Sequence, residues 1–397
     1  MHKSAGPRSP HSAVVLASSS VTSSALPLAF MSGLVVQIRA ELDLGLDLYG
    51  LLVAGYFFAT ASTSRLLGPT VERLGAGRSI RLAAFTTTLA LILLGTATDP
   101  FQLGAGLIVA GIANSFAHPA ANRLLSKLVP RDRQGLAFGI KQASIPAATL
   151  LGGLAVPIVG LTIGWRWAFA GGSLATAAIL LTPIAPAITP RPRVRDVAPR
   201  RRSGRQDPAS RRLRRALLPL AIGGAFGAAS SAPLKTFLVD SGVETGLQEA
   251  TAGLLLATAS ATGILARVVA GAAADRSVRA EPARIITAML AIGASGLLGL
   301  AIGTPLLFVT GALIGYGAGW SWNGLLHFVA VSRGAAAPAT ATSTVQTGLS
   351  FGAGAGPLLL GVVVAHFGYA VGWLVMAALM LVAAAIIGLW ARRSEDT

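Results

Sequence analysis

Cysteine is absent from this 397-residue sequence, and charged residues make up only 12% of it. Without cysteine, the chain can form no disulfide bond, thiolate nucleophile or cysteine-ligated metal site. Its charged fraction lies far below the ~25% that is typical of soluble domains. Hydrophobic residues account for 53%, and the mean hydropathy is +0.68. A chain this apolar indicates a protein that is surrounded by lipid.

Acidic residues are scarce as well, with 15 Asp and Glu against 32 Lys and Arg and a net charge of +17. In a soluble protein this excess would suggest nucleic-acid binding, but here the basic residues occupy short segments between apolar runs, so we expect no nucleic-acid partner. No P-loop occurs, no nucleophile motif such as G-x-S-x-G occurs in a loop where it could work, and the five histidines are scattered. We therefore expect no enzyme activity, no cofactor, no metal site and no ATP-driven step.

Long apolar runs recur along the chain, and a helix needs about 20 mainly apolar residues to cross a bilayer. The first run is long, is interrupted by serines and shows no clear small-x-small cleavage site before a soluble domain, so we interpret it as a retained span rather than a signal peptide. The fold class that follows is an all-α membrane protein with twelve transmembrane helices in two six-helix bundles. The expected spans are 13–38, 47–67, 80–98, 102–122, 136–160 and 165–187, then 216–238, 248–272, 283–302, 305–329, 338–365 and 369–391.

The basic residues between these spans are one-sided. With both termini in the cytoplasm, the inner segments hold nearly all Lys and Arg, while the outer loops hold only Arg39, Arg166 and Lys235. This bias predicts a multi-pass protein of the cell membrane with both termini cytoplasmic. The acids expected in outer loops are Glu41, Asp43, Asp47, Asp240, Glu244 and Glu249.

The chain divides into residues 1–188, a linker at 189–215 and residues 216–397. The linker is rich in Arg and Pro, a composition that cannot bury apolar area and that predicts disorder in the cytoplasm. It could be a tether that fixes the topology, or it could dock on anionic lipid.

An internal repeat relates the two halves at an offset near 203–204. A glycine precedes an acid–arginine pair by four residues after both the second and the eighth span, which is typical of secondary transporters with a site between their halves. The matched residues are Gly68, Glu72 and Arg73 with Gly271, Asp275 and Arg276, Gln142 with Gln346, and Gly164 with Gly368.

These features resemble the major facilitator superfamily, whose signature loop reads roughly G-x-x-x-D-R-x-G-R-[RK]. Here the loop has Glu72 in place of Asp, followed by Arg73, Gly75 and, one residue later than usual, Arg78. Three further stretches resemble its organic-anion carriers, although Leu107 lies near the place where those carriers often hold an arginine. The stretches are His118-Pro-Ala-Ala-Asn122-Arg123, Gly164-Trp-Arg-Trp-Ala-Phe169 and Gly319-Trp-Ser-Trp-Asn-Gly324.

The resemblance implies a gating latch at the cytoplasmic end that holds the inner gate in the outward-open state. A carboxylate beside an arginine can form charged hydrogen bonds of this kind. The alternative is a solvated turn. The candidate gating residues are Glu72, Arg73, Arg78, Asp275 and Arg276.

Three basic residues, Arg65, Lys141 and Arg267, lie within expected spans, and no acid does. Intramembrane charge suggests a functional site, but all three could snorkel to the cytoplasmic surface, and for Arg65 and Arg267 we favour a structural role. Polar and aromatic residues within the spans could line a water-filled cavity, or could serve packing and hydrogen bonding between helices. The substrate-binding candidates are Lys141, Gln142, Asn114, His118, Trp320, Trp322, Asn323 and Gln346, and His118 and His327 could carry a proton.

The sequence therefore predicts a secondary active transporter of a small organic solute, anionic or neutral, that works by alternating access between two halves. A cation carrier would need a buried carboxylate. The alternatives are a drug or metabolite efflux pump of the same fold, or a transporter-like sensor without flux. The expected partners are the substrate, the lipid bilayer and a co-transported proton or ion, and we expect a monomer.

Overall fold

The regular structure is helical throughout the part of the chain that the computed structural model describes, residues 10–130, 133–182, 208–274, 282–333 and 338–393. Two short π-helices, η2 and η4, continue α5 and α10. The first half holds α1 Pro10–Gly33, α2 Val35–Leu42, α3 Leu46–Gly95, α4 Pro100–Leu128, α5 Gln134–Ala155, η2 Val156–Gly160 and α6 Trp165–Leu181. The second half holds α7 Pro208–Glu244, α8 Glu249–Ala274, α9 Pro282–Ile302, α10 Pro305–Ile314, η4 Gly315–Gly319, α11 Asn323–Arg333 and α12 Pro338–Arg393.

Two of the helices each contain two of the expected spans. α3 bends at Gly75 and α12 at Gly368, both with a φ of 79°, a left-handed value that favours glycine. Gly164, the repeat partner of Gly368, also has a positive φ of 99°. Because of these breaks, the helices and the expected spans do not correspond one to one.

Eight helices are long and apolar enough by themselves to cross a membrane, or nine if the bent pair Val35–Leu42 and Leu46–Ser64 counts as one span, among the described residues. The other three expected spans are present in shorter or broken form. They are the 17-residue α6, the segment made of α10, η4 and α11, and the second limb of α12. The expectation of twelve spans in an all-α membrane fold is thus confirmed.

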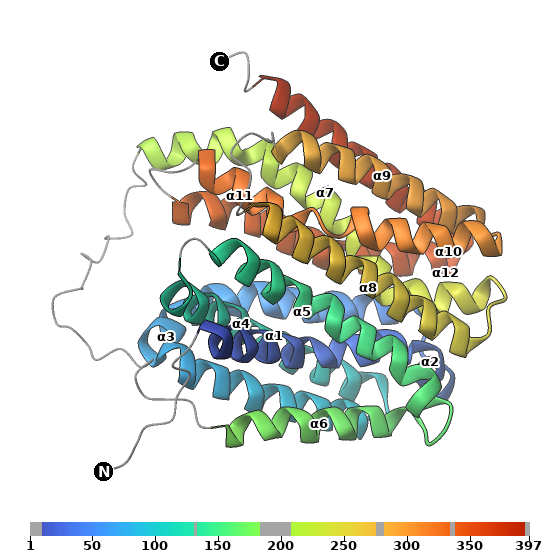
Figure 1. Cartoon of the computed structure of the whole chain (residues 1–397). Helices are drawn as coiled ribbons and strands as arrows, with labels where there is room; N and C mark the ends of the chain where they lie inside the picture. The colour runs from blue at the N-terminus through green and yellow to red at the C-terminus, as the bar shows by residue number, and fades with distance from the viewer. Residues whose placement is uncertain (1–9, 131–132, 183–207, 275–281, 334–337, 394–397) are drawn as a thin grey trace, which may run out of the picture.

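The helices of the two halves lie on opposite sides of the molecule, α1–α6 below and α7–α12 above in Figure 1. Small residues allow helices within each half to touch. A Cβ at Gly152 of α5 would lie 2.3 Å from the carbonyl oxygen of Ala29 in α1, so this crossing requires glycine. The equivalent crossing in the second half pairs Gly348, Gly352 and Gly356 of α12 with Ala221, Ala225 and Ala229 of α7.

The two halves touch from one end of the bundle to its middle. We call this the distal end, because it carries the α2–α3, α7–α8 and α9–α10 connections and lies opposite the termini (Figure 1). Gly153 of α5 packs on Gly253 of α8, and Gly50 of α3 packs on Gly361 of α12. Closer to the middle, Gly354 meets the ring of Phe58. The described contacts therefore join the halves from the distal end to the middle of the bundle.

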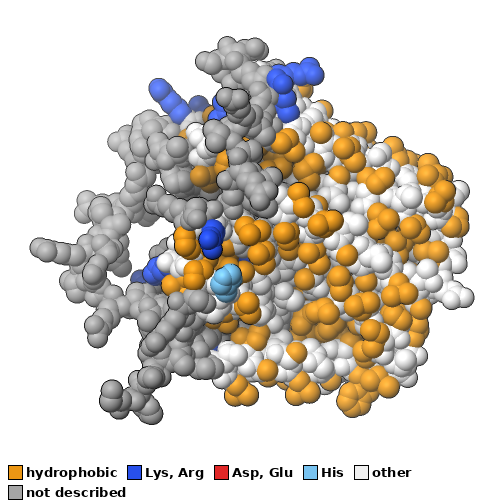
Figure 2. All heavy atoms as spheres, viewed as in Figure 1, with side chains coloured by type: hydrophobic (Ala, Val, Ile, Leu, Met, Phe, Trp, Pro, Cys, Tyr) orange, Lys and Arg blue, Asp and Glu red, His pale blue; other side chains and the backbone are white. Residues whose placement is uncertain are grey.

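The outer surface of the bundle is apolar, as lipid exposure requires. Large hydrophobic side chains such as Phe101 and Leu174 are 90% and 74% exposed. Figure 2 shows hydrophobic side chains spread over the visible face, with its Lys and Arg side chains toward the end that carries the termini. This distribution matches the basic bias that the sequence predicts for that end.

Two expectations about the seventh span need correction. α7 runs on to Glu244, so Lys235 and Asp240 are helical and do not lie in an outer loop. The reason is that apolar residues continue beyond Lys235 at Phe237, Leu238 and Val239, which are all buried. α7 also begins at Pro208, within the expected linker, because arginine is a good helix former and proline suits a first helical position.

The rest of the linker and the loop around Asp275 and Arg276 lie outside the described residues. The division of the chain into residues 1–188, 189–215 and 216–397 stays a prediction.

Candidate functional site

Lys141 points into the first half and does not extend to the membrane surface. Its Nζ lies 3.0 Å from Nδ1 of His118 on α4 and 3.1 Å from Oε1 of Gln142. Because an ammonium group can only donate, both atoms act as acceptors. Lys141 is 3% exposed. Lys141 thus connects two other predicted site residues, His118 and Gln142, and its ammonium group is already hydrogen-bonded inside the half.

Asn114 extends this cluster toward α1. It lies one helical turn before His118 on α4, and its Oδ1 accepts a hydrogen bond of 3.3 Å from the Ser24 hydroxyl. The cluster in the first half therefore joins α1, α4 and α5 at a similar depth.

The second half holds a similar cluster on the counterparts of α4 and α5. Asn323 and His327 repeat the four-residue spacing of Asn114 and His118. The Nε2 of His327 lies 3.0 Å from Oε1 of Gln346 on α12. Gln142 and Gln346 are repeat partners, but the histidines are 209 residues apart (327 − 118) and so do not match at the repeat offset of 203–204, and Val345 stands where the first half has Lys141.

Arg267 is buried on α8, and protein groups bond its guanidinium. Nη1 donates to the carbonyl of Gly263 at 3.1 Å and to the Ser321 hydroxyl at 3.4 Å, and Nη2 donates to the carbonyl of Trp320 at 2.5 Å. Its guanidinium carbon lies 4.6 Å from the Trp320 ring centroid. These bonds satisfy backbone carbonyls next to η4, where regular helical pairing is interrupted. The arrangement supports the structural interpretation of Arg267.

The two candidate tryptophans lie in different surroundings. Trp322 is fully buried, and its indole N–H donates to the carbonyl of Gly319 at 2.9 Å. A Cβ at Gly227 of α7 would lie 2.5 Å from its ring, so Trp322 fills a gap in the core. Trp320 instead lies between the cations Arg267 and Lys235.

Lys235 is a site residue that the sequence analysis missed. Its Nζ lies 4.6 Å from the ring centroid of Phe57 in the first half and 5.6 Å from that of Trp320 in the second half. The signal was present in the sequence, because the predicted seventh span, 216–238, already contains Lys235. Lys235 therefore lies at the meeting place of the two halves.

The middle of the molecule is positively charged. Lys235 and Arg267 both lie against the ring of Trp320, and Lys141 lies on α5 of the first half. Asp240 is the one acidic residue among the buried polar residues of the described ranges, and it lies at the distal end. The described central side chains thus combine basic groups with no carboxylate.

At the distal end, by contrast, charges are paired across the two halves. Arg39 of α2 donates to Oδ1 of Asp240 in α7, while the Tyr369 hydroxyl of α12 donates to Oδ2. Gln37 donates to Glu249 of α8 at 2.8 Å. These bonds tie α2 of the first half to α7 and α8 of the second, and the Tyr369 bond adds α12 to the network.

A cavity of about 320 Å³ lies beside this pair, so water can reach it from the distal side. Its lining residues are Val36, Arg39, Ala40, Asp43, Leu44, Gly45 and Asp240.

Glu41 lies beyond the predicted end of the first span and forms a second, more exposed pair. The Trp165 indole N–H donates to Oε2 of Glu41 at 2.5 Å, and Arg166 donates to Oε1. The Trp165 hydrogen bond, followed by that of Arg166, lowers the pKa of the Glu41 carboxyl. This pair lies within the first half and links α2 to α6.

The predicted cytoplasmic latch falls largely outside the described residues. Asp275, Arg276 and the side chains of Glu72 and Arg65 lie outside the described residues, whereas Arg73 and Arg78 are exposed. The structure does account for the glycine of the motif, since Gly75 occupies the bend of α3. The gating role stays a prediction.

Comparisons with known proteins agree with this architecture. The family model of the Major Facilitator Superfamily matches residues 12–239 and 220–397. A chloramphenicol resistance protein of Streptomyces lividans is 28% identical over 352 residues, which is 85% of each chain. The multi-drug resistance efflux pump PmrA of Streptococcus pneumoniae is 25% identical over 163 residues, 37% of this chain and 41% of its own.

Among solved structures, a bacterial homolog of the human lysosomal transporter Spinster, in an inward-facing and unoccupied conformation, superposes with a TM-score of 0.70. It is 17% identical and covers 98% of both chains. This likeness concerns the fold. Because the family model spans nearly the whole sequence and the helices form its expected architecture, this multi-span membrane protein belongs to the Major Facilitator Superfamily of secondary transporters.

Proposed function

We propose that this protein carries a small organic anion across the cell membrane by alternating access between its two halves. The observation that carries the proposal is the charge of the centre, where Lys141, Lys235 and Arg267 face no described carboxylate. Removing a charge from water is costly unless an opposite charge or hydrogen bonds offset it. An anionic substrate would supply the missing charge in transit, whereas a cation would be repelled. A neutral solute is the weaker alternative.

The substrate site is proposed to lie between the two clusters of polar residues. Lys141, Gln142, His118 and Asn114 would form its first-half wall, and Trp320 with Lys235 its second-half wall. Asn323 and Gln346 would line the path toward the termini. Trp322 is not proposed as a contact because it packs inside the second half.

Orientation and coupling belong to the same proposal. The basic bias supports cytoplasmic termini, so the distal end would face outward and the structure would have its outer side closed. Glu72 with Arg73 and Arg78, and Asp275 with Arg276, would latch the opposite end in the outward-open state. A proton is the proposed co-transported ion, with His118 as a candidate carrier, and the working unit would be a monomer.

Efflux of drugs or metabolites is the second candidate, because the relatives found over most or part of the chain are named as resistance proteins. Exchange in proteoliposomes tests both. Purified protein is reconstituted, the vesicles are loaded with anionic or neutral metabolites or with chloramphenicol, and entry of the labelled compound is followed. Anion exchange above that of empty vesicles supports the proposal. Exchange of chloramphenicol alone favours efflux, and no exchange with any compound favours a sensor without flux.

A further inference from the structure

Lys235 differs from the other basic residues of the centre in the contacts that its charged group makes. Lys141 bonds His118 and Gln142, and Arg267 bonds three protein oxygen atoms. For the Lys235 ammonium group, the structure shows only aromatic faces within the described residues, at 4.6 and 5.6 Å. An ammonium carries three donors. All three are free to bond a ligand.

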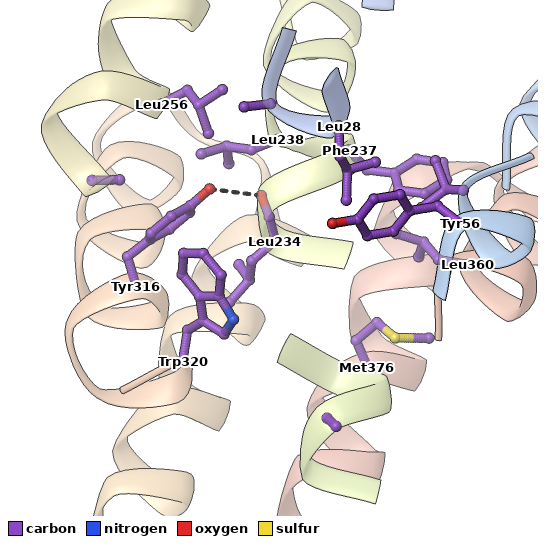
Figure 3. Packing of buried hydrophobic residues seen from close by; sticks show 14 of the residues in the cluster. Leu28, Tyr56, Leu234, Phe237, Leu238, Leu256, Tyr316, Trp320, Leu360 and Met376 are labelled. Atoms are coloured by element: carbon purple, nitrogen blue, oxygen red, sulfur yellow. Dashed lines mark hydrogen bonds between the residues drawn. The ribbon is translucent and has the colours of Figure 1, made fainter. Parts of the chain in front are cut away.

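The surroundings of this ammonium are apolar and come from both halves. Phe57 belongs to α3, and Trp320 follows η4. Figure 3 shows Leu234, the neighbour of Lys235 on α7, with Trp320 and Tyr316 on one side and Tyr56 on the other. Ring faces attract a cation, but they offer no oxygen that could replace its lost hydration. The Lys235 side chain is still only partly buried, so a small molecule can approach it.

This combination of one unsatisfied cation and flat apolar walls defines a ligand chemistry. We propose that Lys235 binds the carboxylate of an organic monoanion whose flat, apolar body lies against Phe57 and Trp320. A single negative charge fits because Lys141 and Arg267 already have protein partners. A ring-shaped body fits because aromatic pairs stack face to edge or offset. The inference rests on the proposed transport function and names the substrate class of that site.

The position of Lys235 also links ligand binding to the ion pair that closes the distal end. Lys235 and Asp240 are five residues apart on α7, and Asp240 closes the distal end with Arg39. An anion bound between Phe57 of the first half and Trp320 of the second contacts both bodies that move in alternating access. Lys235 is therefore placed both to bind the anion and to transmit its presence along one helix.

Thermal stability of the purified full-length protein in detergent tests the proposal. Benzoate is the probe, benzamide its neutral counterpart of the same shape, and phthalate the dianion. Because a ligand that binds only the folded protein raises the melting temperature, titration of the shift yields an affinity for each compound. The variants are Lys235→Gln and Lys235→Arg, with Lys127→Gln as the matched control, since Lys127 is an exposed lysine at the end of α4.

We expect benzoate to stabilise the wild type and the Lys127→Gln variant, and benzamide to have little effect. Lys235→Gln should weaken benzoate binding about 10- to 100-fold, the loss expected for one charged hydrogen bond, and Lys235→Arg should retain part of it. Without ligand, Lys235→Gln should melt no lower than the wild type, because the change removes an unpaired charge. That measurement separates lost binding from lost folding.

Several results would each overturn the inference. They are stabilisation by benzamide equal to that by benzoate, tighter binding of phthalate than of benzoate, and undiminished benzoate binding by Lys235→Gln. Absence of any benzoate effect on the wild type would do the same. The proposed function is judged separately by exchange in proteoliposomes, so a protein that exchanges anions but binds benzoate without Lys235 refutes this inference alone.

Discussion

The distal end and the centre of this protein differ in whether a basic side chain has an acidic partner. At the distal end, Arg39 pairs with Asp240 across the boundary between the halves, and Asp240 also accepts a hydrogen bond from Tyr369 of its own half. In the centre, Lys235 meets only aromatic faces. A pair that spans two moving bodies stabilises the state in which they touch. An unpaired cation is stabilised when a ligand arrives. The difference suggests that the distal charges set the conformation and the central charges select the substrate.

The largest effect should come from breaking the distal network. Asp240→Asn leaves Arg39 facing a neutral amide in a partly buried site, where loss of one partner of an ion pair costs about 2–4 kcal/mol. We expect a lower melting temperature and greater labelling of a cysteine introduced at Val36, beside the cavity. Glu41→Gln, in the exposed pair with Arg166, is the matched control. Equal shifts in the two variants would show that burial across the halves adds nothing.

A smaller effect is expected at Lys141, whose charge is already bonded. Lys141→Gln should weaken anion exchange about tenfold, which is the effect of one ordinary hydrogen-bond energy. Lys141→Arg should keep part of the exchange because it keeps the charge. The affinity measured in proteoliposomes should fall less than for Lys235→Gln. Near-native affinity in both Lys141 variants would remove Lys141 from the site.

The predicted cytoplasmic latch should have a more modest influence. Glu72→Ala and Asp275→Ala are each expected to slow exchange several-fold at equal expression, with Glu72 the more severe because its motif is more complete. Each loses charged hydrogen bonds that act in only one state. Exchange rates in reconstituted variants provide the measurement. Wild-type rates in both would identify these residues as ordinary loop charges.

The smallest effect concerns acid and the exposed Glu41 pair. The bonds from Trp165 and Arg166 lower the pKa of Glu41 below its usual value of 4.5. A lowered pKa contributes stability above the usual value, and this contribution is lost as the pH falls through the folded-state pKa. Because the pair is exposed, the expected contribution is below about 1 kcal/mol. Melting curves from pH 6 downward should separate wild type from Glu41→Gln slightly, and the difference should vanish in acid.

The fold was predictable because lipid imposes a simple rule. Apolar runs of membrane length and the one-sided basic residues led to twelve spans, and the structure contains them. The bends at Gly75 and Gly368 join spans into longer helices without changing that count. For His118, Lys141 and Gln142, the sequence predicted only that they belong to one site, and not that they are hydrogen-bonded. Which atoms bond depends on how α4 and α5 are rotated.

Lys235 and Asp240 were missed for a common reason. A charged residue near the end of an apolar run looks like the beginning of a loop. Lys235 was therefore assigned to an outer loop although the predicted span 216–238 contains it, and the span was ended before Asp240. The structure extends α7 to Glu244 because the buried residues Phe237, Leu238 and Val239 continue its apolar face beyond Lys235. Asp240 finds Arg39 and Tyr369, which are distant in sequence. Phe57 and Trp320 likewise reach Lys235 only through tertiary packing.

The most direct test of the central claim is exchange of three compounds of one shape and different charge. Proteoliposomes with purified wild-type protein are assayed for entry of labelled benzoate, benzamide and benzylammonium under identical conditions. The cationic centre predicts that benzoate exchange exceeds that of the other two by about tenfold or more, and that Lys235→Gln removes most of the advantage. Exchange of benzylammonium or benzamide as fast as benzoate would contradict the account.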